Sequence, residues 1–141
     1  MFHFAYGSNM DPERMHQRCP DAADPRVAAL AEFRFAISAL GVANIVPAEG
    51  AQVHGVLWTV SQRDLENLDR LEGVAEGPSQ RRSLVVEAAS GERVDAVVYM
   101  APDARTGPPK EGYLERILRG ARIARLPEGY ITELEQWAKG S

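Results

Sequence analysis

The sequence has a single cysteine, Cys19, among its 141 residues, so no disulfide can form within the chain. Cys19 stands before Pro20 in an expected loop, and no neighbouring residue would activate its thiol as a nucleophile. Lysine is scarce too: Lys110 and Lys139 are the only two, and the arginines are scattered along the chain. With a net charge of −4, the sequence shows no basic patch, which argues against binding to nucleic acid.

Long hydrophobic runs are also missing from the sequence. No segment reaches the roughly 20 apolar residues that a membrane-spanning helix needs, and the apolar run near the N-terminus is too short for a signal peptide. We therefore expect a cytoplasmic protein with no membrane partner. With 45% hydrophobic and 26% charged residues, the composition is that of a folded globular domain rather than of a disordered segment.

Motifs for metals and cofactors are absent as well. The three histidines, His3, His16 and His54, do not have the spacing of metal ligands. No phosphate-binding loop, dinucleotide-binding fingerprint or nucleophile elbow occurs. The sequence therefore predicts neither a metal nor a cofactor.

The patterns that are present predict one α+β domain over residues 1–141, because no repeat or linker divides the chain. Apolar and alternating patterns predict strands over residues 2–6, 27–38, 52–60, 81–87 and 93–100. Helical patterns predict helices over residues 12–18, 61–72 and 113–118 and a last helix beginning near residue 126. Turn residues predict breaks at 19–25, 49–50, 77–80, 88–92, 102–110 and 120–121, and residues 41–47 are predicted to form a turn and a short extended piece. Together these elements predict a mostly antiparallel sheet or barrel with helices packed around it.

The segment Gln52–Val60 is apolar on both alternating faces, so we expect it to be a central strand that is covered on both sides. Gly55 lies in the middle of this segment and indicates a bulge or a close approach of another backbone. Ser61 and Asp64 then form the pattern of a capping box, which predicts the start of the next helix.

The first candidate site is the turn Tyr6-Gly7-Ser8-Asn9, which joins the first strand to a helix capped by Asp11. Such a turn can leave several backbone N–H groups pointing into one concavity, where they bind a carboxylate or another anion. Gly7 allows a ligand to approach the main chain, and Ser8 and Asn9 add polar side chains. The alternative is an ordinary polar turn with no ligand.

The second candidate is Glu72, because its carboxylate lies in the last turn of a predicted helix, where the helix dipole disfavours negative charge. Leu65, Leu68 and Leu71 form an apolar stripe beside it. Both effects would raise the pKa of Glu72 and suit it to transfer protons near neutral pH. The alternative is that Glu72 faces water. Other carboxylates of this helix are expected mostly on its polar face as solvated charges, namely Asp64, Glu66 and Asp69.

Several blocks of the sequence together resemble the gamma-glutamylcyclotransferase family, and their order and spacing match that family over nearly the whole chain. The blocks are Phe4-Ala5-Tyr6-Gly7-Ser8-Asn9-Met10, Val53-His54-Gly55-Val56-Leu57-Trp58, Leu68-Asp69-Arg70-Leu71-Glu72-Gly73-Val74, and Tyr113 followed by Gly120-Ala121 and Leu126-Pro127-Glu128-Gly129-Tyr130. The combination of the Tyr-Gly-Ser-Asn opening with the Glu-Gly-Val block is fairly specific.

The resemblance implies a mixed, mostly antiparallel β-barrel with flanking helices. It also implies an enzyme that converts a small gamma-glutamyl amino acid or gamma-glutamyl amine into 5-oxoproline and a free amine, without a cofactor or a metal. Glu72 would be the catalytic acid and base. The substrate-binding residues would be Tyr6, Gly7, Ser8, Asn9 and Tyr113. The protein would be a monomer or a homodimer.

One departure from the family pattern leaves alternatives open. Members commonly carry a tyrosine shortly after the Glu-Gly block, and Ser79 stands about where that tyrosine would be. A non-catalytic module of the same fold that binds gamma-glutamyl compounds or small carboxylates is therefore the main alternative. A partner-binding domain with an apolar patch at Tyr130 and Trp137 is a third possibility. The sequence lacks the Tyr-Gly-Ser-Leu variant of glutathione-specific relatives, so glutathione is not the favoured substrate.

Overall fold

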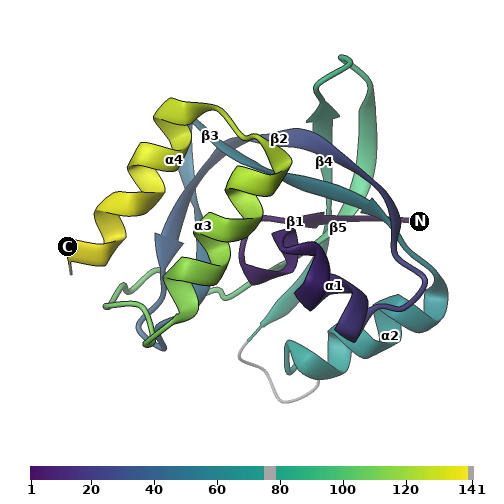
Figure 1. Ribbon diagram of the computed structural model, residues 1–141, viewed down its shortest axis with the longest axis horizontal. Coiled ribbons are helices and arrows are strands. Elements are labelled where there is room, and N and C mark those ends of the chain that lie inside the picture. The colour runs from purple at the N-terminus through teal and green to yellow at the C-terminus, as the bar shows by residue number, and fades with distance from the viewer. Residues whose placement is uncertain (75–78, 140–141) are drawn as a thin grey trace.

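The computed structural model describes residues 1–74 and 79–139 and shows a β-barrel flanked by helices (Figure 1). The described strands are β1 (Phe2–Ala5), β2 (Ala23–Ile37), β3 (Ala43–Thr59), β4 (Gln80–Ala88) and β5 (Arg93–Met100). The described helices are α1 (Pro12–Arg18), α2 (Gln62–Leu71), α3 (Tyr113–Ala124) and α4 (Glu128–Glu135), with short 3-10 helices η1 (Ser8–Met10) and η2 (Gln136–Lys139). Part of the predicted loop at 77–80 lies outside the described residues.

The strands close into a barrel in the order β1-β3-β2-β4-β5. The pairings of β3 with β1 and β2, and of β4 with β2 and β5, are antiparallel. The barrel is closed by one parallel contact between β1 and β5, where His3 pairs with Val97. The predicted α+β fold, a mixed and mostly antiparallel barrel with flanking helices, is therefore confirmed.

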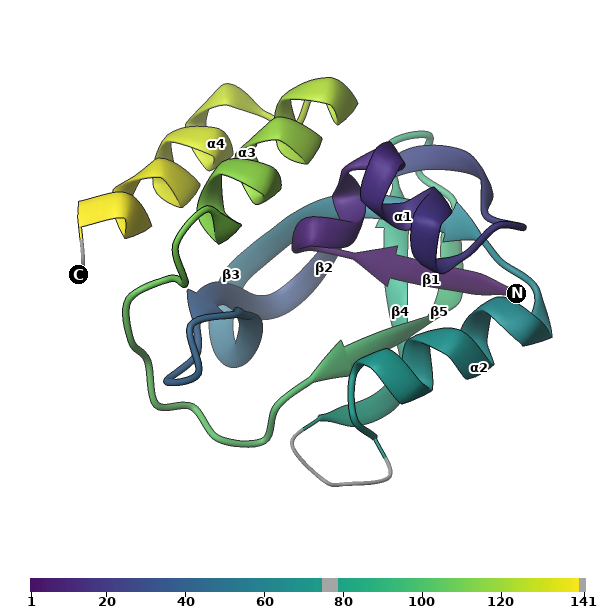
Figure 2. The ribbon, with the colours of Figure 1, turned by 60° about the horizontal axis from the view of Figure 1, so that its bottom comes forward.

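The helices lie in two groups on the barrel (Figure 2). Helices α3 and α4 lie side by side, and α3 also packs against η1, which follows the end of β1. Helix α2 lies against the side of the barrel formed by β4 and β5, and it contacts α1. Large apolar side chains from both the strands and the helices are fully buried between them, including Phe4, Trp58, Leu65, Leu68 and Ile117. This arrangement places η1, the end of α2 and the start of α3 around one end of β1.

Gly55 lies where the backbones of β3 and β1 come close together, as the sequence predicts. Strand β3 pairs with β1 on one edge and with β2 on the other, but every strand of the closed barrel has two neighbours, so no strand is central in the predicted sense. A Cβ atom added at Gly55 would clash with the carbonyl oxygen of Ala5 and the ring of Phe4. Glycine is therefore required here so that β3 can pass close to β1.

Two predicted breaks are wrong because the strands continue through them. The expected turn at Glu49–Gly50 lies inside β3, where residues 48–51 oppose only Glu32 of β2. Gly50 has a φ of +78°, and its N–H donates to the Glu32 carboxylate at 2.9 Å. The turn signal therefore marks a bulge, after which the ladder resumes. Similarly, β2 begins at Ala23, inside the predicted 19–25 loop, with an irregular register between Ala23 and Arg26.

Helix α3 is longer than the sequence predicts. The glycine at position 120 was expected to follow the helix, whereas α3 continues to Ala124. A Cβ atom at Gly120 would lie 2.6 Å from the backbone nitrogen of Asp11 and 2.7 Å from the carbonyl carbon of Met10. Close packing of α3 on η1 therefore explains a glycine in the helix interior, where its intrinsic propensity is low.

Helix α2 begins as predicted, since Ser61 and Asp64 form a complete capping box. The expectation that Asp64 is a solvated charge is wrong. Its side chain is fully buried and accepts hydrogen bonds from the backbone N–H groups of Ser61 at 3.2 Å and Asp21 at 3.4 Å. A carboxylate that caps a helix from inside the fold is stabilised by these donors rather than by water.

Candidate active site

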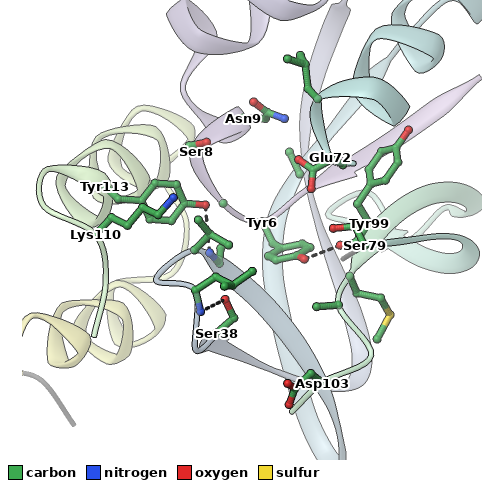
Figure 3. A pocket seen from close by; sticks show the side chains of 18 of the residues that line it. Tyr6, Ser8, Asn9, Ser38, Glu72, Ser79, Tyr99, Asp103, Lys110 and Tyr113 are labelled. Carbon is green, nitrogen blue, oxygen red and sulfur yellow. Dashed lines mark hydrogen bonds between the residues drawn. The ribbon is translucent and has the colours of Figure 1, made fainter. Parts of the chain in front are cut away.

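A cavity of about 620 Å³ opens at the end of β1 (Figure 3). Its walls come from η1, the end of α2, the segments 38–43 and 99–105, and the start of α3. All six residues that the sequence analysis singles out for binding or catalysis line this cavity: Tyr6, Gly7, Ser8, Asn9, Glu72 and Tyr113. The fold thus brings Glu72 to the same cavity as the Tyr6–Asn9 turn, although Glu72 lies 63 positions after Asn9 in the sequence.

The Tyr6–Asn9 turn presents the start of the 3-10 helix η1 to the cavity. The carbonyl groups of Gly7 and Ser8 accept hydrogen bonds from Met10 at 3.1 Å and Asp11 at 3.2 Å. The N–H groups of Ser8 and Asn9 stand at the helix start, and no side chain in the described part of the chain caps them. A Cβ atom at Gly7 would lie 2.9 Å from the Ala43 side chain, so only glycine fits this position. The turn can therefore offer N–H donors to an anion.

The side chains around this turn are held by hydrogen bonds to the barrel. The Tyr6 hydroxyl donates to the backbone carbonyl of Tyr99. The Tyr113 hydroxyl accepts from the backbone N–H of Ala43 at 3.1 Å. Asn9 is held twice, because its carbonyl oxygen accepts from the Trp58 indole and its side-chain oxygen accepts from the Arg18 guanidinium. These contacts fix the cavity wall before any ligand enters.

Glu72 is the C-cap residue of α2, and its carboxyl group faces the cavity near Tyr6 (Figure 3). Burial raises the pKa of the Glu72 carboxyl above its ordinary value, and the nearby Arg18 guanidinium opposes this shift. Within residues 1–74 and 79–139, no cation forms an ion pair with Glu72. A partly buried carboxyl without an ion pair can accept and return a proton near neutral pH.

The predicted apolar stripe beside Glu72 is only partly correct. Leu65 and Leu68 are fully buried, but Leu71 is 50% exposed and forms part of the cavity wall. Gly73 has a φ of +71°, and its N–H donates to the carbonyl of Arg70, as expected of a left-handed residue after a helix. The helix therefore ends so that Leu71 and Glu72 border the cavity.

Asp69 anchors the same end of α2 to the barrel, although the sequence suggested a solvated charge. It accepts a hydrogen bond from the Tyr99 hydroxyl at 2.6 Å, and its other oxygen forms an ion pair with Arg81 at 2.9 Å. Burial, together with this hydrogen bond, raises the pKa of Tyr99, which stays a neutral donor. Since Asp69 lies one helical turn before Glu72, these contacts help to position the Glu72 carboxyl.

Sequence reasoning missed further cavity residues that only the fold brings together, notably Arg18, Tyr99, Arg105 and Lys110. Arg18 ends α1, and a basic residue there is commonly assigned to the helix dipole, so its contact with Asn9 had no distinct sequence signal. Ser79, which the family resemblance places about where a tyrosine would be, also lines the cavity.

Other sequence candidates lie outside this site. Cys19 is buried, and burial raises the pKa of its thiol to about 12, so it stays protonated at neutral pH. In the described chain, no group of three histidine, cysteine or acidic side chains could hold a metal ion. None of the described helices is long and apolar enough to cross a membrane. Tyr130 is buried and Trp137 packs edge-on against Phe35, so these two aromatics belong largely to the core.

Known proteins with similar sequences and folds agree with this architecture. The model of the AIG2-like family matches residues 52–134. The gamma-glutamylcyclotransferase of Homo sapiens is 32% identical over 143 residues, which cover 94% of this chain and 76% of the human protein. The gamma-glutamylcyclotransferase of Mus musculus is 30% identical with the same coverage. A solved gamma-glutamyl cyclotransferase structure has a TM-score of 0.89 and 30% identity, covering 96% of this chain and 86% of that one.

The closed barrel and its cavity thus define a small α+β enzyme fold. The chain belongs to the AIG2-like family, and within it to the gamma-glutamylcyclotransferase-like enzymes. The family resemblance drawn from the sequence blocks is therefore confirmed.

Proposed function

We propose that this enzyme converts a gamma-glutamyl amino acid or gamma-glutamyl amine into 5-oxoproline and the free amine, with Glu72 as general acid and base. The observation that carries the proposal is the cavity shared by two chemically different parts. One is the Tyr6–Asn9 turn with its N–H donors, and the other is the Glu72 carboxyl, which has no ion pair in the described chain.

The turn is suited to hold the α-carboxylate of the gamma-glutamyl group. Backbone N–H groups at the start of η1, together with the Ser8 hydroxyl, are donors that a carboxylate accepts. Tyr6 and Tyr113 supply the walls, and both hydroxyls already have backbone partners. Held in this way, the substrate would present its α-ammonium group toward Glu72.

The reaction then needs mainly geometry and the movement of protons. Ionised Glu72 removes a proton from the substrate's α-ammonium group, and the freed amine attacks the γ-carbonyl carbon of the same molecule. A C–N bond forms as the five-membered ring closes, and the original amide C–N bond breaks. Glu72 gives the first proton to the departing nitrogen, which leaves as a neutral amine. The ring nitrogen then loses its second proton to Glu72, which passes it to solvent, and no water is consumed. Holding the substrate in the conformation that brings its amine next to its γ-carbonyl carbon supplies much of the rate enhancement for such an intramolecular attack.

The environment of Glu72 matches both halves of this proton transfer. Burial brings the carboxyl pKa closer to neutral pH, which makes Glu72 a better base and a usable acid. The Arg18 guanidinium opposes this shift in pKa and so favours the ionised form that accepts the proton. As pH falls through the raised pKa, Glu72 becomes protonated, and kcat/KM is expected to fall with it.

Replacement of Glu72 by glutamine tests the proposal. Glutamine keeps the shape of the side chain but cannot accept the proton, so we expect 5-oxoproline release to fall by about 100-fold or more. The measurement is 5-oxoproline formation from a panel of gamma-glutamyl amino acids and amines. Glu66→Gln is the matched control, because Glu66 lies exposed on the same helix and should keep full activity.

Two results would contradict the proposed roles. Release by Glu72→Gln at the parental rate would exclude Glu72 as the acid and base. Binding of the panel compounds to the parent enzyme without any release would instead support the non-catalytic binding module, with Ser79→Tyr as the first variant to test for restored turnover.

A further inference from the structure

We propose that Arg116 is a positioning residue for this site. Through its ion pair with Asp11, it holds the start of α3 against η1 and so fixes the distance between Tyr113 and the N–H donors of the Tyr6–Asn9 turn. This inference rests on the proposed function and deepens it, because it names what keeps the gamma-glutamyl binding part in shape. Neither Arg116 nor Asp11 lines the cavity, so both act through the residues that do.

Asp11 joins η1 to the rest of the fold with both its backbone and its side chain. Its N–H donates to the Ser8 carbonyl at 3.2 Å, which closes η1. One carboxylate oxygen, Oδ1, accepts from the Glu13 N–H at 3.1 Å and caps α1. Because Asp11 is fully buried, its negative charge needs a partner inside the protein.

Arg116 on α3 provides that partner. Its Nη1 donates to Asp11 Oδ2 at 2.9 Å, and its side chain is 31% exposed. Arg119, which lies three residues later, approaches the same oxygen only to 3.5 Å, is 53% exposed and also contacts Glu13 at 3.6 Å. Arg116 therefore makes the direct hydrogen bond, and Arg119 supplies a second positive charge that keeps Asp11 from being buried unpaired when Arg116 is replaced.

The ion pair ties α3 to η1 next to the site. Arg116 lies three residues after Tyr113, so the two side chains share one side of α3. Tyr113 lines the cavity and accepts from the Ala43 N–H at 3.1 Å. Four residues after Arg116, Gly120 lets the α3 backbone lie directly on the backbone of Asp11. The ion pair and this close contact together set how far the start of α3 stands from the turn.

The two sides of the cavity are held by separate contacts. In Figure 3, Tyr113 lies on one side of Tyr6 and Glu72 lies on the other. Glu72 is carried by α2, which the hydrogen bond of Asp69 anchors to β5. Loss of the Arg116 ion pair should therefore loosen the side that binds the gamma-glutamyl group and leave the proton-transfer side in place.

Arg116→Met and Arg116→Lys test the inference through kcat and KM for 5-oxoproline release from the best substrate of the panel. We expect Arg116→Met to raise KM by about 10-fold and to keep kcat within about 2-fold of the parent, because binding is loosened while Glu72 stays in place. Arg116→Lys should return KM to within about 3-fold of the parent, since lysine still offers a cation to Asp11. Partial unfolding alone would lower the concentration of active enzyme, and hence the apparent kcat, at an unchanged KM.

Arg122→Met is the matched control. Arg122 lies on the same helix and forms an ion pair of the same length, 2.9 Å, but its partner is Glu135 of α4 rather than a residue beside η1. Arg122→Met should have the parental KM. A parental KM in Arg116→Met, a fall in kcat alone, or an equal rise of KM in Arg122→Met would overturn the inference.

Asp11→Asn tests the same ion pair from its other end, also where Arg116→Met does not fold. The amide oxygen can still cap α1, but the charge that Arg116 pairs with is gone, so KM should rise by a similar factor. Adding Arg116→Met to Asp11→Asn should then change KM by less than about 2-fold, because the ion pair has already been removed. Independent effects of the two substitutions, which multiply, would overturn the inference.

Failure of the proposed function gives a different result from failure of this inference. If the parent protein releases no 5-oxoproline from any panel compound, calorimetric titration with 5-oxoproline itself replaces the kinetic assay, because the turn would hold its carboxylate in the same way. Binding about 10-fold weaker to Arg116→Met than to the parent and to Arg122→Met would support the role of Arg116. Equal binding to all three proteins, or no binding to the parent, would overturn it.

Discussion

At the scale of single residues, the unusual feature is Glu72, whose partly buried carboxyl group has no ion-pair partner among the described residues. The acidic residues nearby are treated differently: Asp64 caps its own helix, and Asp69 pairs with Arg81 and Tyr99. Burial raises the pKa of the Glu72 carboxyl. A residue held in an environment that disfavours its charge is a candidate for chemistry rather than for stability.

This environment predicts how Glu72 affects stability. The folded protein binds the Glu72 proton at higher pH than the unfolded chain, because the folded-state pKa is raised. The stabilising contribution of the neutral carboxyl is complete below the ordinary glutamate pKa and is lost as pH rises through the raised pKa. Glu72→Gln, which is always neutral, should therefore be more stable than the parent near pH 8 and about equally stable near pH 4.

Urea denaturation of both proteins at the two pH values measures this difference. Equal stability near pH 8 would show that Glu72 is as well solvated in the folded state as in the unfolded chain. The prediction is independent of activity, so it tests the burial of Glu72 even if the proposed reaction is wrong.

At the scale of elements, the site depends on glycines that let backbones approach each other. Gly55 brings β3 against β1, which leads into the Tyr6–Asn9 turn, and Gly120 brings α3 against the backbone of η1. The start of α3 carries Tyr113 into the cavity wall. Two close contacts between elements thus support the same short turn from opposite sides.

Gly55→Ala is expected to destabilise the protein by about 2–3 kcal/mol, because the added methyl group clashes with the Ala5 carbonyl and β1 must shift. Gly129→Ala is the matched control. No atom lies within 4 Å of a Cβ atom built at Gly129, and this residue lies in α4, where alanine is the better helix former. It should stabilise the protein by up to about 1 kcal/mol. Urea denaturation of both variants gives the comparison, and similar effects of the two would contradict the proposed clash.

At the scale of the whole molecule, the barrel is closed at the single parallel pairing between β1 and β5. His3 lies at this closure with 4% of its surface exposed, and its Nδ1 donates to the Val97 carbonyl at 3.0 Å. Burial lowers the pKa of His3 to about 4, against an ordinary value of 6.5. The histidine is therefore neutral in the folded protein throughout the physiological range.

This closure predicts sensitivity to mild acid. The unfolded chain takes up a proton on His3 below about pH 6.5 while the folded protein does not, so the stabilising effect of neutral His3 is present above that pH and is lost as pH falls toward 4. Between pH 7 and 5, His3 should cost about 2 kcal/mol of stability. His3→Asn keeps a donor near the Nδ1 position and cannot titrate. Its free energy of unfolding, measured with urea, should fall by about 2 kcal/mol less over this range than that of the parent.

Much of the architecture is predictable from local sequence. Helix α1 has the predicted bounds, Ser61 and Asp64 cap α2, and Gly55 marks a close contact, because each depends on neighbouring residues or on a steric need that only glycine meets. The extent of β3 was not predictable in this way. The signal at Glu49–Gly50 is the same for a turn and for a bulge, and the pairing with β2 decides between them.

For the site, the sequence by itself determined the chemical parts: a glycine turn with free N–H donors, and a glutamate at the end of an amphipathic helix. Their nature follows from short-range rules of capping, turn geometry and helix polarity. Only the tertiary structure decided that both parts line one cavity, that Asp69 is tied to Tyr99, and that Lys110 is seated beside Tyr113. The physical reason is that closing the barrel sets the contacts between residues far apart in the chain, and no local pattern encodes those distances.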